Sequence, residues 1–322
     1  MNYINLAPTA KLAATPSAPE ATLPVSDLPT VSLPRLALVG TLFSLVWSSA
    51  FIAGKIGMTS TGPLTLLSLR FLLAGALLVL LGRWLGASGQ APRVDRSILL
   101  IALAAGLLTN AVYLGLAYSG MRTVPAGLTA ILASTSPLLT ALLAALWLRE
   151  PFGWHGALGL LAGFAGVVWI MGGRASSMPA DTTGVLLILA GTMALAASTL
   201  LNWRAVAGGL DPWRIALVQL PASGLALLPL AWWRENLAIR FDTAFFGSLI
   251  YQAAVVSIGT TLMLLWLVRH GGAARAGSFH LLNPAFGTLL AVGLLQEAVP
   301  ASDLVGVLPI VAGLALVLRP GR

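Results

Sequence analysis

The sequence predicts an all-α integral membrane protein with ten transmembrane helices arranged as two inverted five-helix repeats. Three observations lead to this fold class. Hydrophobic residues make up 58% of the 322-residue chain and charged residues only 9%, with a mean hydropathy of +0.92, whereas soluble domains carry roughly 25% charged residues. Ten separate segments are long and apolar enough to cross a bilayer. One passage of about 45 residues occurs twice, which indicates an internal duplication.

The ten expected helices follow from the length of apolar sequence that a bilayer requires, about 20 residues. Glycines, prolines and charged residues interrupt the apolar sequence between them. The segments are residues 36–56, 64–84, 97–118, 125–148, 154–172, 184–206, 213–233, 243–268, 276–296 and 302–319. We expect the first repeat to span residues 35–173 and the second to span residues 183–320.

Residues 1–34 differ in composition from the rest of the chain. They are rich in Ala, Pro, Thr and Ser and contain no long apolar run. Such a segment buries too little apolar surface to offset the entropy of ordering it. It also lacks the basic start and apolar core of a secretory signal. We therefore expect a disordered cytoplasmic tail.

The duplicated passage is marked by one proline, one glutamate and two glycines in each copy. The first copy contains Pro137, Glu150, Gly159 and Gly166, and the second contains Pro284, Glu297, Gly306 and Gly313, each 147 positions later. Upstream, Pro63 and Arg70 match Pro212 and Gln219 at an offset of 149. Each copy contains five expected helices, an odd number, so the second copy enters the bilayer from the opposite side. Inverted repeats of this kind permit alternating access around a site near the membrane midplane.

The positions of Lys and Arg predict the orientation of the chain. With the amino terminus placed inside, twelve basic residues lie near cytoplasmic segment ends and five near outer ends. Cytoplasmic loops carry the excess of positive charge in membrane proteins. We expect both termini to be cytoplasmic, in a multi-pass protein of a bacterial inner membrane.

Composition argues against several classes of function. The net charge is +8, but only two of the eighteen basic residues are lysines, and no basic run is interleaved with aromatics, so nucleic acid is not expected as a partner. The chain has no cysteine, which excludes disulfides and thiolate metal ligands. It also has no HExxH, GxSxG or Walker A motif and no paired acids within the apolar segments. We expect neither an enzyme nor a bound cofactor or metal.

Arg70 is the one basic residue placed well inside an expected helix. A charge at that depth costs several kcal/mol unless it is paired, hydrated or extended to the surface. Its guanidinium could bind a substrate carboxylate or phosphate in a bidentate way. Alternatively, it could extend to the outer membrane surface or bond backbone carbonyls at a helix end. The sequence leaves both interpretations open.

The two repeated prolines lie in the middle of expected helices. Pro137 follows Ser136, and Pro284 follows Asn283, with His280 one turn earlier. A proline at such a position removes an intrahelical hydrogen bond and can kink the helix, which exposes carbonyls where the backbone lines a cavity. We predict a substrate site beside these kinks, including Ser136, His280 and Asn283. His280 is either a proton relay or cargo partner, or a neutral imidazole bonded to a neighbouring helix.

Other polar and amphipathic groups at depth complete the predicted substrate site. Buried amides are costly in a membrane unless they line a cavity or find partners. The further candidates are Trp47, Asn110, Tyr113, Asn202 and Gln252. Trp47 could equally be a packing aromatic. Glu150 and Glu297, at the ends of equivalent helices, are interpreted as turn-fixing residues or as gating partners of arginines.

The motifs resemble the EamA branch of the drug/metabolite transporter superfamily. The resemblance rests on the stretch Trp47-Ser48-Ser49-Ala50-Phe51, on Pro63 followed by Arg70, and on the two Pro-x12-Glu passages with trailing glycines. It covers residues 36–319. It implies ten helices, a central cavity between the two repeats, and movement of small metabolites, often outward.

We therefore predict a secondary transporter that moves small organic metabolites, amino acids or related compounds, out of the cell by alternating access. Its partners would be a small-molecule substrate and the lipid bilayer. No Asp or Glu lies near the centre of an expected helix, so facilitated diffusion and coupling to protons both remain open. The alternatives are a multidrug exporter or a metabolite importer of the same fold, or a membrane protein without a transport function.

Overall fold

The fold is described from a computed structural model, which covers residues 31–85, 95–124, 132–133, 135–148, 153–175, 181–295 and 301–318. Most of the tail that we expect to be disordered, residues 1–30, lies outside the described residues, as do Glu150 and Glu297. Within the described ranges the chain is almost entirely helical, and its single β feature is an isolated bridge between Thr61 and Ile239.

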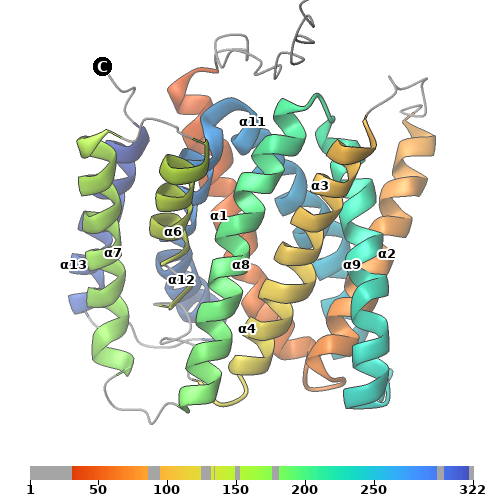
Figure 1. Cartoon of the computed structure of the whole chain (residues 1–322). Helices are drawn as coiled ribbons and strands as arrows, with labels where there is room; N and C mark the ends of the chain where they lie inside the picture. Colours follow the sequence, from red (N-terminus) through yellow and green to blue (C-terminus); the bar gives the residue numbers. More distant parts are fainter. Residues whose placement is uncertain are drawn as a thin grey trace, which may run out of the picture.

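The helices stand side by side as one bundle (Figure 1). The first half of the chain forms α1 (Leu33–Gly57), α2 (Pro63–Trp84), α3 (Arg96–Gly106), η2 (Leu107–Tyr113), α4 (Leu114–Gly120), α6 (Ser136–Leu143), η3 (Ala144–Leu148) and α7 (Trp154–Ala175). The second half forms α8 (Thr182–Ala207), α9 (Pro212–Glu235), α10 (Thr243–Tyr251), η4 (Gln252–Thr260), α11 (Thr261–Ser278), η5 (Phe279–Leu282), α12 (Asn283–Leu295) and α13 (Ala301–Leu318). The segments η2, η3 and η4 are π-helical, and η5 is a 3-10 helix.

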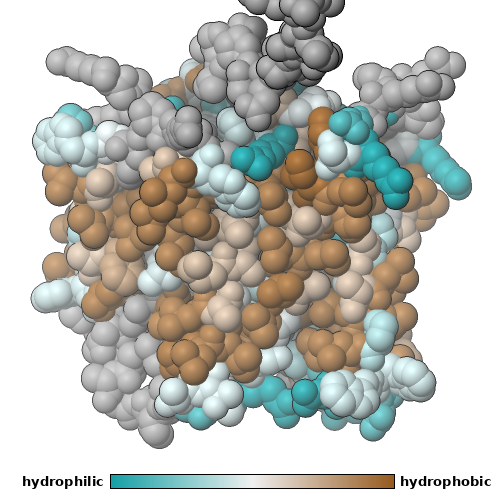
Figure 2. Space-filling view, in the orientation of Figure 1, coloured by the Kyte–Doolittle hydropathy of each residue, from teal (hydrophilic) through white to brown (hydrophobic). Residues whose placement is uncertain are grey.

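Six helical runs in the described residues are long and apolar enough to cross a membrane. They are Leu33–Gly57, Pro63–Trp84, Arg96–Gly120, Thr182–Ala207, Pro212–Glu235 and Thr243–Gly287. Shorter apolar helices are Ser136–Trp147, Trp154–Trp169 and Leu308–Leu318. Figure 2 shows hydrophobic residues across the middle of one face and hydrophilic residues gathered towards its two ends. The chain is thus an integral, multi-pass membrane protein.

The longest helical run changes direction at Gly272. Its φ of 78° and ψ of 168° are non-helical, and glycine adopts a positive φ without the steric cost that a side chain brings. The run therefore consists of two pieces, divided where the sequence predicts a separator between residues 268 and 276.

The repeated prolines lie where regular helix begins. Pro137 is the second residue of α6, after a turn at Thr135. Pro284 is the second residue of α12, directly after the 3-10 segment η5. A proline in the first turn lacks only a donor that would have no intrahelical partner. The chain therefore accommodates each proline through a change of helical geometry just before it.

Acidic side chains cap helix starts throughout the described part of the chain. A carboxylate at this position accepts hydrogen bonds from backbone N–H groups that have no partner within the helix. Asp95 caps α3, Asp181 caps α8, Asp211 caps α9 and Asp242 caps α10. Glu235 reaches from the end of α9 to the first residues of α2. These five carboxylates therefore accept hydrogen bonds from backbone N–H groups at helix starts.

Two pairs of antiparallel helices join equivalent segments of the two repeats. Glu235 at the end of α9 contacts the start of α2, whereas Trp213 at the start of α9 lies against Gly82 near the end of α2. Similarly, α7 packs along α13. These two pairs lie at opposite sides of the bundle in Figure 1, with the remaining helices between them.

Glycines permit the close packing of α7 against α13. A Cβ atom on Gly159 would lie 2.5 Å from the carbonyl oxygen of Gly313, and one on Gly166 would lie 2.5 Å from that of Gly306. Helices in membranes commonly approach closely through such small residues. The glycines that mark the sequence repeat therefore face one another across the two copies.

Candidate functional site

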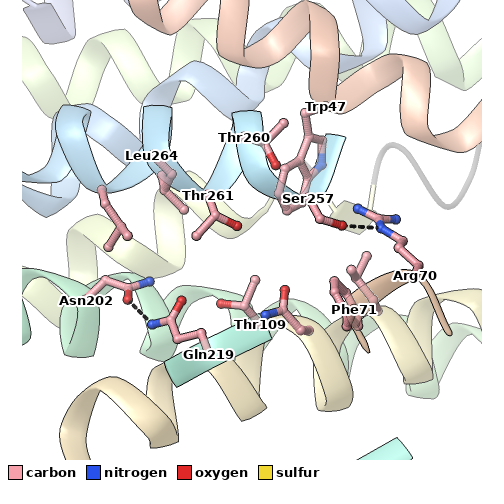
Figure 3. Close-up of a pocket in the computed structure, with 13 residues that line it drawn as sticks. Trp47, Arg70, Phe71, Thr109, Asn202, Gln219, Ser257, Thr260, Thr261 and Leu264 are labelled. Carbon is pink, nitrogen blue, oxygen red and sulfur yellow. Dashed lines mark hydrogen bonds between the residues drawn. The ribbon is translucent and has the colours of Figure 1, made fainter. Parts of the chain in front are cut away.

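A polar cavity lies inside the bundle between helices of both repeats. In this conformation its own side chains fill most of it, and the cavity volume is about 20 Å³, room for little more than a water molecule. Figure 3 shows its side chains converging from opposite walls. The lining residues are Trp47, Arg70, Phe71, Thr109, Asn110, Leu114, Asn202, Gln219, Ser257, Thr260, Thr261, Leu264 and Leu265.

Arg70 and Gln219 mark two ends of the cavity. Arg70 is seven residues after Pro63 at the start of α2, and Gln219 is seven residues after Pro212 at the start of α9. At 1.5 Å per residue, each lies about 10 Å from the start of its helix. Because α2 and α9 are antiparallel, the cavity lies between these two positions, in the central part of the bundle (Figure 3).

The Arg70 side chain is held inside the protein and is only 3% exposed. Its Nε donates to Ser257 Oγ at 2.7 Å, and its Nη1 donates to Gln252 Oε1 at 2.9 Å. The guanidinium carbon lies 5.1 Å from the centre of the Phe71 ring. Because the side chain is buried and bonds to side chains of η4, it does not extend to the surface, which was one of the two interpretations of the sequence.

The described residues provide no carboxylate for Arg70. In that part of the chain the one ion pair joins Arg240 to Asp242, and Asp95, Asp181, Asp211 and Glu235 accept hydrogen bonds at helix starts. Glu150 and Glu297 lie outside the apolar segments of the sequence. The guanidinium has five N–H donors, and two of them have acceptors among the described side chains. The Tyr118 hydroxyl lies near the guanidinium and has no hydrogen-bond partner among the described residues.

Neutral polar groups also line the cavity. Gln219 Nε2 donates to Asn202 Oδ1 at 2.7 Å and to the carbonyl oxygen of Ala102 at 3.1 Å. Thr109 Oγ1 donates to Ser198 Oγ at 2.5 Å. Amides and hydroxyls can both donate and accept, so this wall can bind polar groups of either kind without adding a charge.

Trp47 joins the cavity to an aromatic cluster. Its ring stacks on Tyr113 with centroids 6.4 Å apart, and it meets the His280 ring in a T-shaped arrangement with centroids 5.1 Å apart. Phe43 packs against both Trp47 and His280. Asn283 Nδ2 and His280 Nδ1 are 3.0 Å apart. His280 therefore belongs to a packed aromatic group beside the cavity and does not line it.

Several buried polar atoms near the repeated prolines lack a hydrogen-bond partner among the described residues. They are Ser136 Oγ, Thr140 Oγ1, His280 Nε2 and Asn283 Oδ1. Buried polar atoms are usually satisfied by protein or by ordered water. The helices that carry them, α6 and η5 with α12, also contact one another.

The structure divides the predicted site residues into two groups. Trp47, Arg70, Asn110 and Asn202 line the cavity. Gln252 does not line the cavity but accepts a hydrogen bond from Arg70. The residues that lie outside the lining without this contact are Tyr113, Ser136, His280 and Asn283. Polar lining residues that were not in the predicted site are Thr109, Gln219, Ser257, Thr260 and Thr261. Of these, the repeat offset indicates Gln219, because it occupies the position equivalent to Arg70 and differs from it.

Two π-helical segments border the cavity at equivalent places in the repeats. The segment η2 covers residues 107–113, and an offset of 147 carries it onto residues 254–260, within η4. A π-helical turn is often found at functional sites, because the wider turn redirects neighbouring side chains. Thr109 and Asn110 reach the cavity from η2, and Ser257 and Thr260 reach it from η4.

At one end of the bundle, loops of the two repeats contact each other. Ser60 Oγ donates to the two carboxylate oxygens of Asp242 at 2.8 and 2.9 Å. The backbone N–H of Arg240 donates to Ser60 O at 2.8 Å, and Thr61 Oγ1 donates to Ala238 O at 2.8 Å. We call residues 59–62 together with residues 235–242 the loop clasp.

An apolar cluster packs on the side of the cavity away from the loop clasp. Its buried members are Ala102, Ala205, Val206, Leu210, Ile215 and Leu265. Leu265 also lines the cavity. Hydrogen bonds thus join the two repeats at one end of the bundle, while apolar packing lies towards the other.

A multi-pass helical bundle with a polar cavity between two repeated halves is the architecture of a membrane transporter. The chain belongs to the EamA-like transporter family, whose model matches residues 35–172 and 182–319. This match confirms the resemblance to EamA-type members of the drug/metabolite transporter superfamily, and it shows that two EamA repeats are present.

Relatives with similar sequences are named as transporters. The uncharacterized transporter YvbV of Bacillus subtilis (strain 168) is 29% identical over 292 residues, which cover 88% of this chain and 91% of that protein. The uncharacterized inner membrane transporter YedA of Escherichia coli (strain K12) is 29% identical over 278 residues, covering 81% and 84%. One solved crystal structure with 21% identity covers 89% of this chain and 98% of its own, with a TM-score of 0.73, and shows a shared fold.

Proposed function

We propose that the protein is a secondary transporter that moves small organic metabolites, amino acids or related compounds, outward by alternating access. The observation that carries this proposal is the polar cavity, whose walls come from both repeats and whose two ends carry Arg70 and Gln219. A site at the interface of two halves becomes accessible from either side when the halves rock against each other.

The proposal includes ten membrane helices in two inverted repeats. Helix contacts that recur under exchange of the repeats support it. The pairs α2 with α9 and α7 with α13 each join equivalent helices. The contacts of α1 with α10, η4 and α11 correspond to those of α8 with α3, η2 and α4. Such reciprocity is expected of a two-fold relation between the halves.

The proposal also includes a bacterial inner membrane with both termini in the cytoplasm. The distribution of Lys and Arg supports this orientation, and the relative in Escherichia coli is named as an inner membrane protein. In this orientation the loop clasp lies on the outer side. Rupture of the clasp would then accompany release of the substrate to the outside.

Counterflow in proteoliposomes tests the proposed function. Vesicles with purified protein would be loaded with one unlabelled compound and diluted into a trace of the same compound in labelled form. The panel would contain amino acids, carboxylic acids, nucleosides and cationic dyes. We expect labelled uptake above protein-free vesicles for a subset of organic metabolites. If no compound exchanges, although circular dichroism shows a folded helical protein, the transporter proposal is wrong.

Coupling is tested in the same vesicles. The cavity contains no described acidic residue that could carry a proton with the substrate, so we propose exchange or facilitated diffusion. Flux should then be unaffected by an imposed pH gradient. A gradient-driven accumulation would instead implicate His280, the buried imidazole beside Trp47.

A further inference from the structure

The cavity contains a positive charge that the described residues do not balance. Arg70 is buried, and its two hydrogen-bond acceptors, Ser257 and Gln252, are neutral. A buried ion without a counter-ion is costly, and a membrane interior increases that cost. The bonds from η4 nevertheless hold the guanidinium at the cavity wall, where it is available to a ligand.

The chemistry of the rest of the cavity restricts the ligand further. Among the described lining residues there is no Lys and no second Arg, so these side chains provide a single positive charge. Thr109, Asn202 and Gln219 are neutral, so they favour hydroxyl, amide or amine groups but give an ammonium no counter-charge. The apolar side chains of Phe71, Leu114 and Leu264 also line the cavity and can contact a short hydrocarbon.

We infer that the substrate of the proposed transporter carries one carboxylate and no net positive charge, and that Arg70 binds this carboxylate. This inference rests on the proposed function. A guanidinium with free N–H groups can bind a carboxylate in a bidentate manner. One cation matches a monoanion, whereas a doubly charged phosphate ester would leave one negative charge unbalanced. Small hydroxy acids and other monocarboxylates therefore fit better than amines or phosphate esters.

Matched pairs of compounds test the inference. The counterflow panel would contain several monocarboxylic acids, including the 2-hydroxy acid analogues of the aliphatic amino acids. The primary amide of each acid would be included, together with glycerol 3-phosphate and a cationic dye. We expect at least one acid to exchange while its amide does not. Exchange of an amide at the rate of its acid, or exchange confined to the phosphate ester or the dye, would overturn the inference.

Variants of Arg70 then identify the binding group. Arg70→Gln should reduce exchange of the acid by roughly tenfold to a hundredfold, the range expected for charge-assisted hydrogen bonds. Arg70→Lys keeps the positive charge but loses the planar guanidinium that binds a carboxylate in a bidentate manner. Its exchange rate for the acid should therefore lie between those of Arg70→Gln and the wild type. Arg83→Gln is the matched control, because Arg83 lies exposed near the end of the same helix, and it should exchange like the wild type. Wild-type exchange by Arg70→Gln would contradict the inference.

A binding measurement separates loss of recognition from loss of fold. The exchanged acid should raise the melting temperature of the wild type and of Arg83→Gln in detergent, because a ligand stabilises the state that binds it. It should leave the melting temperature of Arg70→Gln unchanged. An equal rise in the melting temperature of Arg70→Gln would show that the carboxylate of the acid binds at a site other than Arg70. Absence of all exchange would remove the proposed function itself, whereas exchange of neutral or cationic compounds alone would remove only the carboxylate inference.

Discussion

The carboxylate of Glu235, at the end of α9, caps the start of α2 through Thr65. One oxygen accepts from the backbone N–H of Thr65 at 2.8 Å and from its hydroxyl at 2.7 Å, while the other accepts from the N–H of Leu64 at 3.0 Å. A Cβ on Gly62 would collide with this carboxylate. The helix cap is thus provided by the other repeat and belongs to the loop clasp.

Replacing Glu235 should weaken the contact between the repeats. Glu235→Ala removes both acceptors and should lower the free energy of unfolding by about 1 kcal/mol, a typical cost for a lost helix cap. Glu235→Gln keeps one carbonyl acceptor, so its loss should be smaller. Thermal unfolding in detergent measures both. Equal stability of Glu235→Ala and the wild type would show that the cap contributes nothing.

Asp242 should make the loop clasp sensitive to acid only at low pH. The pKa of its carboxyl is lowered to about 2, first by the backbone N–H of Phe245 and then by Ser60 and Arg240. Because the folded pKa lies below the ordinary value of about 3.8, the stabilisation is fully present above pH 4. It is lost as the pH falls towards 2.

The measurement for Asp242 is a pH series of melting temperatures. We expect the wild type to lose stability between pH 4 and pH 2 by more than Asp242→Asn does, since the variant has no carboxyl to protonate. Between pH 5 and pH 7 the difference between the two proteins should be constant. A difference that changes in the neutral range would point to another titrating group.

A side chain at Gly159 should separate α7 from α13. Gly159→Ala would place a Cβ atom 2.5 Å from the carbonyl oxygen of Gly313, and backbone atoms cannot move aside as a flexible side chain can. We expect a loss of about 1–3 kcal/mol in the free energy of unfolding. Gly247→Ala is the control, because a Cβ on this glycine of α10 meets nothing within 4 Å. If both variants unfold alike, the close approach is not required.

A carboxylate at position 219 should change which compounds are carried. Gln219→Glu would offset the charge of Arg70, and Asn202 can rotate its amide to donate to the new carboxylate. Exchange of a monocarboxylate should fall, while exchange of the zwitterionic amino acid with the same skeleton should rise relative to it. Gln219→Met removes the hydrogen bonds without adding charge and should not shift this ratio. Counterflow of the two compounds in parallel measures it.

The sequence predicts both the helical fold and the family of the chain. These predictions depend on features that recur along the sequence. Apolar length identifies membrane segments, and the constant offset between copies identifies the duplication. The contact between Gly159 and Gly313 was not predicted, because an offset shows that positions are equivalent and not that they touch. The antiparallel packing of α7 along α13 brings them together.

The hydrogen-bond partners of Arg70 could not be predicted from the sequence either. Depth along α2 is compatible with a side chain that reaches the surface or with one that turns inwards. The outcome depends on whether a neighbouring helix offers acceptors. Gln252 and Ser257 do so from η4, 182 and 187 positions away in the chain. The loop clasp was missed for the same reason, since Ser60 and Asp242 lie in separate loops.

The contact between α7 and α13 has the form of an isologous interface between identical subunits. Gly159 and Gly306 are equivalent positions, as are Gly166 and Gly313, and each glycine meets the equivalent of the other pair: Gly159 meets Gly313, and Gly166 meets Gly306. A surface of this kind is self-complementary. Two separate copies of one such half would therefore present matching surfaces to each other. The covalent link between the halves then raises their effective concentration, and it leaves each half free to acquire a different residue at the position of Arg70 or Gln219.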